Sequence, residues 1–149
     1  MLDTLIGLAR NQILQAALLS WLIAQVLKVM ITWIREGFFS LERLVGSGGM
    51  PSSHSAFVIA LAAGVGSRAG WESPVAAVTV VFSLIVMYDA AGVRRAAGKQ
   101  ARVLNKIITE LAAGKQFNED RLKELLGHTP VEVISGAVLG LVVAFSWLH

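Results

Sequence analysis

The sequence contains no cysteine. This absence excludes disulfide frameworks, zinc sites built from thiolates and cysteine nucleophiles, and it leaves the redox compartment undetermined. Charge is also scarce, because charged residues make up only 15% of the 149 residues and hydrophobic residues make up 55%. A soluble domain of this size needs more charge to cover its surface. The composition therefore excludes a disordered chain, a collagen and a water-soluble α/β enzyme, and it favours an integral membrane protein.

Four stretches with little or no charge are candidates to cross a membrane. They comprise 24 residues between Arg10 and Arg35, 24 between Arg43 and Arg68, 16 from Ser73 to Tyr88, and 17 from Val133 to the end. A spanning helix needs about 20 residues, so the third and fourth stretches reach that length by including Asp89 and Glu132 near their ends. We predict an all-α bundle of four transmembrane helices, forming a single domain over residues 1–149. The start, Met1-Leu2-Asp3, lacks the positive region of a cleaved signal peptide.

The connection between the third and fourth helices is long and polar. Apolar residues repeat there at helical spacing with charged residues between them, namely Val103, Leu104, Ile107, Ile108 and Leu111 with Lys99, Arg102, Lys106 and Glu110. This pattern predicts an amphipathic helix that lies on the bilayer or packs on the bundle and ends near Gly114. Asn118 is then predicted to cap a short second helix. The two helices form an insertion over about residues 96–126.

Basic residues are unevenly divided between the two sides of this topology. Eleven of the 13 fall on one face: Lys28, Arg35, Arg43, Arg94, Arg95, Lys99, Arg102, Lys106, Lys115, Arg121 and Lys123. Arg10 and Arg68 fall on the other face. The positive-inside rule predicts that the crowded face is cytoplasmic. The net charge of +3 is therefore attributed to topology, and we expect no nucleic-acid partner.

Lys28 lies well inside the first apolar stretch, and Arg35 follows seven residues later. Seven residues are close to two helical turns, so both side chains leave the same side of the helix. A snorkelling lysine near a helix end explains Lys28 as well as a functional cation does.

The segment Gly46-Ser-Gly-Gly-Met-Pro-Ser-Ser-His-Ser55 precedes the second apolar stretch. Pro51 fits the first turn of a helix, whose N–H groups together with Ser52 and Ser53 suit an anion. His54 in that turn is placed to give a proton to a phosphate ester oxygen. A capped helix start with an interfacial histidine is the alternative interpretation.

His128 precedes the fourth stretch, and Glu132 follows it by four residues. This spacing lets a carboxylate accept a hydrogen bond from one imidazole nitrogen, which fixes the tautomer and leaves the other nitrogen nucleophilic. A simple ion pair at a membrane interface has the same spacing. Small residues after it, from Gly136 to Gly140, suit close helix packing.

These three elements resemble the signature of the type 2 phosphatidic acid phosphatase superfamily, which includes vanadium haloperoxidases. The superfamily pattern is Lys-x6-Arg-Pro, then Pro-Ser-Gly-His, then Ser-Arg-x5-His-x3-Asp. This chain supplies Lys28-x6-Arg35, then Pro51-Ser-Ser-His54, then His128-x3-Glu132, in the same order and over most of its length. The run Asp89-Ala-Ala-Gly-Val-Arg-Arg95 further resembles the divergent bacterial and plastid branch of small membrane proteins.

The chain departs from the pattern at several positions. No proline follows Arg35, Ser53 stands in place of the glycine, and Glu132 stands in place of the aspartate. No arginine lies six residues before His128, and Arg121 lies seven before it. We expect Arg94 or Arg95 to supply that arginine, with residues 96–126 inserted between the two halves of the third motif.

The resemblance implies a metal-independent lipid phosphate or pyrophosphate phosphatase that needs no cofactor. His128 would form a phosphohistidine, with Glu132 orienting it and His54 protonating the leaving alkoxide. The phosphate oxygens would contact Lys28, Arg35, Ser52, Ser53 and Arg94 or Arg95. We expect a bacterial plasma membrane or a plastid membrane, with a lipid phosphate and membrane lipids as partners, and a homo-oligomer is compatible with this assignment. A phosphotransferase using the same histidine, and a non-catalytic protein that binds anionic lipids or acts as a scaffold, are the alternatives.

Overall fold

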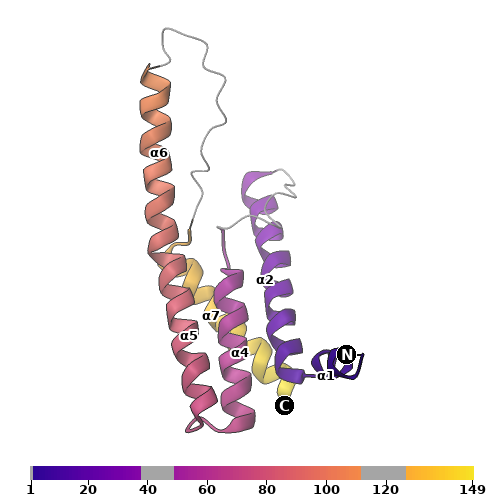
Figure 1. Cartoon of the computed structure of the whole chain (residues 1–149). Helices are drawn as coiled ribbons and strands as arrows, with labels where there is room; N and C mark the ends of the chain where they lie inside the picture. Colours follow the sequence, from indigo (N-terminus) through magenta and orange to yellow (C-terminus); the bar gives the residue numbers. More distant parts are fainter. Residues whose placement is uncertain (1, 38–48, 112–126) are drawn as a thin grey trace.

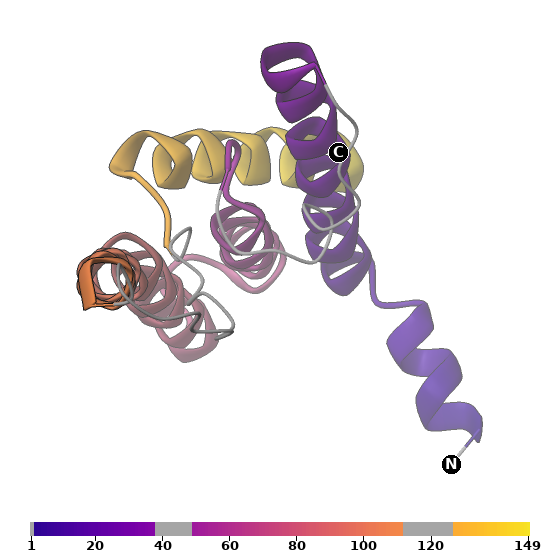
Figure 2. The same cartoon turned by 90° about the horizontal axis from the view of Figure 1, so that it is seen from above.

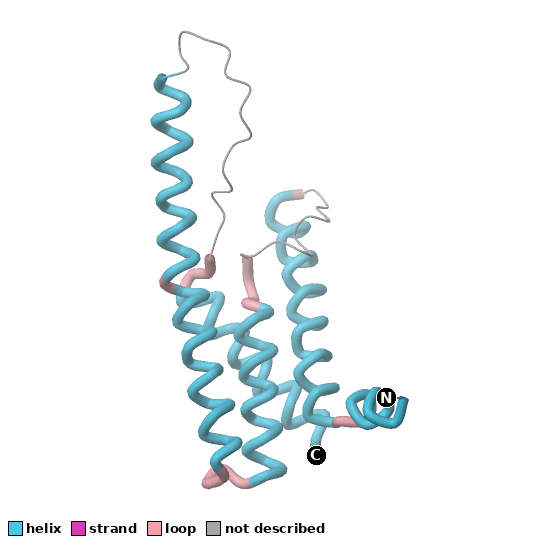
Figure 3. The backbone as a smooth tube through the Cα atoms, viewed as in Figure 1, coloured by secondary structure: helices cyan, strands magenta, loops and turns pink. Residues whose placement is uncertain are grey.

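The computed structural model describes residues 2–37, 49–111 and 127–149, which form helices and short connections (Figure 3). The helices are α1 (Leu2–Ala9), α2 (Gln12–Glu36), α4 (Ser53–Ala69), α5 (Pro74–Ala91), α6 (Val93–Leu111) and α7 (Pro130–Leu148). These ranges contain no strand, as the prediction of an all-α fold requires. The predicted end at Gly114 and the predicted helix after Asn118 lie outside the described residues.

Polar caps and glycines determine where the long helices begin and end. The Asn11 side chain accepts hydrogen bonds from the first turn of α2, and Gly37 ends that helix with a φ of 73°. Ser73 and Thr129 cap α5 and α7, and each is followed by a proline at the first helical position, where a missing N–H does no harm. These side chains satisfy N–H groups that a helix start leaves without partners.

The prediction that Pro51 lies in a first helical turn is wrong by two residues. α4 begins at Ser53, Ser52 is its cap, and Pro51 lies directly before the cap. Ser52 takes the capping position because its hydroxyl oxygen accepts a hydrogen bond from the amide of Ser55. His54 lies in the first turn of α4, as predicted.

Helix α4 lies at the centre of the bundle and contacts α2, α5 and α7 (Figures 1 and 2). Helix α7 crosses behind it at a steep angle, from the side of α5 to the side of α2 (Figure 2). The end of α2, the start of α4, the end of α5 and the start of α7 lie at one end of the bundle, as the sequence predicts (Figure 1). We call this the motif end, defined by Glu36, Ser53, Ala91 and Pro130.

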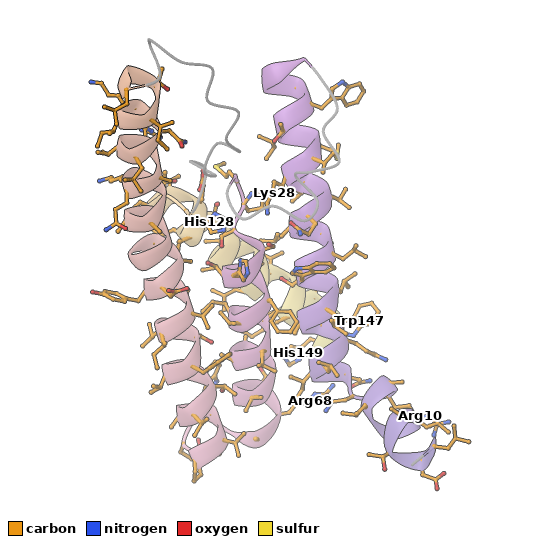
Figure 4. All side chains as sticks on the ribbon, turned by 45° about the horizontal axis from the view of Figure 1, so that its top comes forward. Arg10, Lys28, Arg68, His128, Trp147 and His149 are labelled. Atoms are coloured by element: carbon orange, nitrogen blue, oxygen red, sulfur yellow. The ribbon has the colours of Figure 1, made fainter. Side chains whose placement is uncertain are left out.

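The opposite end of the bundle is held together by Arg68. Its guanidinium donates to Oε1 of Gln12 at 2.8 Å and to the carbonyl of Leu148 at 3.2 Å, so α2, α4 and α7 are joined there. Arg10 and Arg68 both lie at this end of the molecule, away from Lys28 (Figure 4).

Small residues allow α7 to pack directly on the backbone of α4. A Cβ atom at Gly136 would collide with the carbonyl oxygen of Ser52, and one at Gly140 would lie 2.5 Å from the carbonyl oxygen of Ala56. Farther along the same contact, Ala60 and Ala144 are buried in one cluster. The predicted close packing at Gly136 to Gly140 is therefore confirmed. Close backbone approach of this kind is typical of helix contacts in membranes.

The large apolar side chains lie on the outside of the bundle. Leu84, Ile85 and Val78 of α5 are each 60% exposed or more, whereas the buried apolar positions are mostly alanine and valine. Within residues 2–37, 49–111 and 127–149, three stretches are long and apolar enough to cross a membrane: Gln12–Ile34, Pro74–Thr109 and Pro130–Leu148. Helix α4 has 17 residues and is not among the three. An apolar exterior around small interior residues suits a chain surrounded by lipid.

Two elements differ from the sequence-based expectation. Helix α1, for which the sequence analysis predicts no separate helix, turns away from the start of α2 (Figure 2). Helix α6 forms where an amphipathic helix is predicted, but it continues beyond the motif end along the direction of α5 (Figure 1). Of the described helices it contacts α5 alone.

A valine at Gly140 should separate α7 from α4, because its side chain has no space against the backbone of Ala56. Overpacking of this kind typically destabilises by about 1–3 kcal/mol. We expect the midpoint of thermal unfolding in detergent to fall by several degrees. The matched control is Gly7→Ala, because a Cβ atom there meets nothing within 4 Å. An unchanged midpoint for Gly140→Val would contradict the packing of α7 on α4.

Candidate functional site

His128 is held at the start of α7 by its main chain. Its amide donates to the carbonyl of Ala90 at 2.9 Å, which ties it to the end of α5. Gly127 precedes it with a φ of +90°, a conformation that favours glycine, and Thr129 follows as the helix cap. The chain therefore leaves α5 and returns to the same point 38 residues later to place His128, whose side chain is only 1% exposed.

Glu132 holds the imidazole of His128 from one side. Nδ1 of His128 lies 3.2 Å from Oε2 of Glu132, and the same oxygen accepts the amide of Thr129 at 3.0 Å. The Thr129 hydroxyl oxygen in turn accepts the amide of Glu132, which completes a capping box. A carboxylate only accepts hydrogen bonds, so this contact requires the proton on Nδ1. In the neutral ring the lone pair then resides on Nε2, the nitrogen suited to act as a nucleophile.

His54 lies beside His128. The two ring centroids are 6.1 Å apart with an interplanar angle of 61°, an edge-on arrangement. His54 comes from the first turn of α4 and His128 from the segment before α7, so the fold brings together two histidines that are 74 residues apart in the chain. The third histidine, His149, lies toward the other end of the bundle (Figure 4).

The start of α4 is joined to the start of α7 through main-chain atoms. The amide of Ser52 donates to the carbonyl of Glu132 at 2.9 Å, and the Ser52 hydroxyl oxygen accepts from both the amide and the hydroxyl of Ser55. Ser52 and Ser53 are almost fully buried. The hydrogen bonds of Ser52 therefore hold the site in place, while the amide of Ser53 belongs to the positive N-terminal turn of α4.

Lys28 places a buried cation at the motif end, where the two histidines lie (Figure 4). Its side chain is 1% exposed, and Nζ donates to Oε1 of Gln25 at 2.9 Å. Gly49, with a φ of +88°, covers the stem of the lysine, and a Cβ atom there would lie 3.2 Å from its Cγ. Lys28 and His128 point toward the same region at the motif end (Figure 4). A snorkelling lysine would place its ammonium group in water, so the burial of Lys28 argues against that interpretation.

Sequence reasoning missed Gln25. It is 6% exposed and precedes Lys28 by three residues, which places both side chains on one side of α2. The sequence does carry a signal for Gln25: it is a polar residue one turn from an intramembrane cation, within an otherwise apolar helix. The carbonyl of Ala90 was also missed, because a main-chain acceptor leaves no signal in the sequence.

For the predicted arginines Arg35, Arg94 and Arg95, the structure describes the backbone positions only. Arg35 lies in α2 seven residues after Lys28, on the same side of an unbroken helix. Arg94 and Arg95 lie in the first turn of α6, within five residues of the carbonyl that holds His128. Their three side chains lie outside the described part of the structure, as does all of Arg121.

The described residues contain no group of three or more histidine and acidic side chains that could hold a metal ion. The side chains that meet are two imidazoles and one carboxylate against one of them, and the buried ammonium of Lys28 lies at the same end of the bundle (Figure 4). This set suits an anion with a transferable group, because it combines positive charge with a nucleophile and a proton donor.

The fold and the site define a class of protein: a helical membrane protein with paired histidines and a buried lysine at one end of its bundle. The chain belongs to the Divergent PAP2 family, whose model matches residues 9–143. This membership places it in a phosphatase-related superfamily and confirms the resemblance found in the sequence. The chain is 40% identical over 147 residues to the uncharacterized membrane protein YuiD of Bacillus subtilis (strain 168), covering 91% of this chain and 93% of that protein. No solved structure matches the chain.

Gln25→Leu should destabilise the protein, because a buried ammonium group loses a hydrogen-bond acceptor. The loss of such an acceptor costs about 1–3 kcal/mol or more when the remaining group is charged. We expect a lower midpoint of thermal unfolding in detergent for Gln25→Leu, and a smaller change for Gln25→Glu, which keeps an acceptor. Gln100→Leu on the exposed surface of α6 is the control. Equal midpoints for Gln25→Leu and Gln100→Leu would show that the contact does not support Lys28.

Proposed function

We propose that the protein hydrolyses a lipid phosphate or pyrophosphate without a metal ion, through a phosphohistidine on His128. The observation that carries this proposal is the pairing of His128 with Glu132 on Nδ1 and with the ring of His54 on another side. One carboxylate, a nucleophilic nitrogen and a second imidazole are what a two-step phosphoryl transfer requires. The family membership supports the same chemistry.

In the first step, Nε2 of His128 attacks phosphorus while the bond from phosphorus to the lipid oxygen breaks. His54 gives its proton to that leaving oxygen, so that the lipid departs as an alcohol or a monophosphate. In the second step, water attacks the phosphohistidine, His54 accepts a proton from the water, and inorganic phosphate leaves. Glu132 keeps its hydrogen bond to Nδ1 throughout and stabilises positive charge on the ring.

Cations around this site would balance the charge of the phosphoryl oxygens. Lys28 and the N-terminal turn of α4, with Ser52 and Ser53, are the groups whose burial and position support such a role. Arg35 and one of Arg94 and Arg95 complete the proposed set. The hydrogen bond from His128 to Ala90 supports Arg94 or Arg95, because it brings the start of α6 to the reacting residue.

The proposed substrate is a lipid because of where the site lies. The motif end joins three helices whose outer faces are apolar enough to contact lipid. We further propose that α4 is a fourth span: 17 residues extend about 26 Å at 1.5 Å per residue, close to the thickness of the hydrocarbon core. Residues 96–126 form an insertion in this scheme, since the chain leaves from Ala90 and returns to it at His128.

His128→Ala should abolish turnover, because no group remains to accept the phosphoryl group. Protein quenched with labelled phosphatidic acid, phosphatidylglycerophosphate or isoprenyl diphosphate in the presence of a chelator should carry acid-labile phosphate, and the variant should carry none. His149→Ala is the matched control, because this histidine is exposed and lies away from the motif end. Label retained on His128→Ala, or full activity in it, would contradict the mechanism and favour a lipid-binding protein.

His54→Ala should slow hydrolysis on the order of 10²–10⁴-fold, the usual contribution of a general acid. An aryl phosphate, whose leaving group has a low pKa, should recover part of that rate because it needs the proton less. Glu132→Gln should have an intermediate rate, since it keeps a hydrogen-bond acceptor but loses the negative charge. An equal loss for lipid and aryl phosphates in His54→Ala would exclude the role of general acid. Transfer of phosphate to an added alcohol in place of water would identify a phosphotransferase.

We propose that the protein lies in the bacterial plasma membrane with the motif end facing the cytoplasm, because 11 of the 13 basic residues fall on that side. The absence of native cysteine permits a direct test. Single cysteines at Lys106, on α6, and at Glu72, between α4 and α5, are exposed positions that should label from opposite sides of intact cells. Labelling of position 106 from outside the cell would show that the motif end faces outward and would contradict the proposed orientation.

A further inference from the structure

Helix α6 carries an exposed apolar stripe that none of the described helices covers. Val103, Leu104, Ile107 and Leu111 are 58%, 49%, 46% and 80% exposed. At 100° per residue their side chains leave the helix within an arc of about 100°, which makes one continuous stripe. The small or polar residues Gly98, Ala101 and Asn105 are buried on another side of the helix.

A basic stripe borders the apolar stripe. Lys99, Arg102 and Lys106 are exposed and lie on the adjoining arc of the helix. Over the whole of α6 the sequence has five basic residues, Arg94, Arg95, Lys99, Arg102 and Lys106, against the single acidic residue Glu110. A helix with an apolar face and a basic face has the composition of elements that lie in a membrane interface.

The start of α6 coincides with the expected boundary of the bilayer. Helix α5 has 18 residues and extends about 27 Å, which nearly crosses the hydrocarbon core. Gly92 separates the two helices, and its φ of −101° and ψ of −81° depart from helical values. A glycine between a membrane span and an amphipathic helix is a place where the chain can turn from crossing the bilayer to lying along it.

We propose that α6 turns at Gly92 and binds the surface of an anionic membrane. The apolar stripe enters the interface, and the basic stripe contacts anionic lipid headgroups. A basic cluster next to a membrane span is attracted to anionic lipids in this way. A second copy of the chain fits less well, because pairing the apolar stripes would bring basic residues of both copies together.

Cysteines introduced into the full chain test this proposal, since the protein has none of its own. Leu104→Cys places a probe on the apolar stripe, and Thr109→Cys, exposed on the far side of α6, is the matched control. Each variant is labelled with an environment-sensitive fluorophore and reconstituted into vesicles of phosphatidylcholine alone or mixed with phosphatidylglycerol. We expect a blue-shifted signal, quenched by lipid-chain quenchers, for position 104 in the mixed vesicles and neither change for position 109.

Replacing Lys99, Arg102 and Lys106 with glutamine should reverse the signal at position 104. Each charge removed should lower the ratio of membrane-bound to unbound α6 by about fivefold, equivalent to about 1 kcal/mol per basic residue. A water-exposed probe at position 104 in mixed vesicles would overturn the proposal, and equal quenching in both compositions would overturn its dependence on anionic lipid. Fluorophore self-quenching that rises with the ratio of protein to lipid would assign the stripe to a second copy. None of these signals depends on turnover, so the result is independent of the phosphohistidine mechanism.

Discussion

The direct contact between α4 and α7 is the constraint on which the site depends. Gly136 and Gly140 bring the two backbones together, and this approach lets the amide of Ser52 reach the carbonyl of Glu132 at 2.9 Å. His54 follows Ser52 by two residues and Glu132 follows His128 by four, so the same contact sets the distance between the two imidazoles. Larger residues in α7 would move His54 away from His128, since each histidine lies less than two helical turns from the hydrogen bond between Ser52 and Glu132.

The distribution of polarity is the reverse of that in a soluble bundle. Among the described residues, the largest fully buried side chains are Lys28 and His128, and the next largest are those of four serines. Two of these serines donate to carbonyls of a neighbouring helix, Ser20 to Ala56 and Ser83 to Val58. In a membrane such bonds join helices whose apolar faces pack no better against one another than against lipid hydrocarbon chains. Polar contacts hold the interior together, and at the motif end they also supply reactive groups.

Much of this arrangement follows from the sequence. Stretches with little or no charge locate α2, α4, α5 and α7, and the spacing of His128 and Glu132 predicts the contact that the structure shows at 3.2 Å. Other features have no such signal. Helix α1 is a short apolar run beside a polar turn. The joints at Ser52 and Ala90 use main-chain atoms, which every residue has, so only the folded arrangement reveals them.

Main-chain joints also determine which changes in the sequence this architecture tolerates. No side-chain substitution can delete the carbonyl of Ala90 or of Glu132, so residues around the histidines can vary without releasing them, as Ser53 and Glu132 themselves do relative to the superfamily pattern. Insertions and deletions act differently. One residue added between Glu132 and Gly136 would rotate the rest of α7 by about 100° and turn its glycines away from α4. Substitution near the site is therefore tolerated at positions that neither react nor pack backbone to backbone, whereas the length of the helical segments that meet there is restricted.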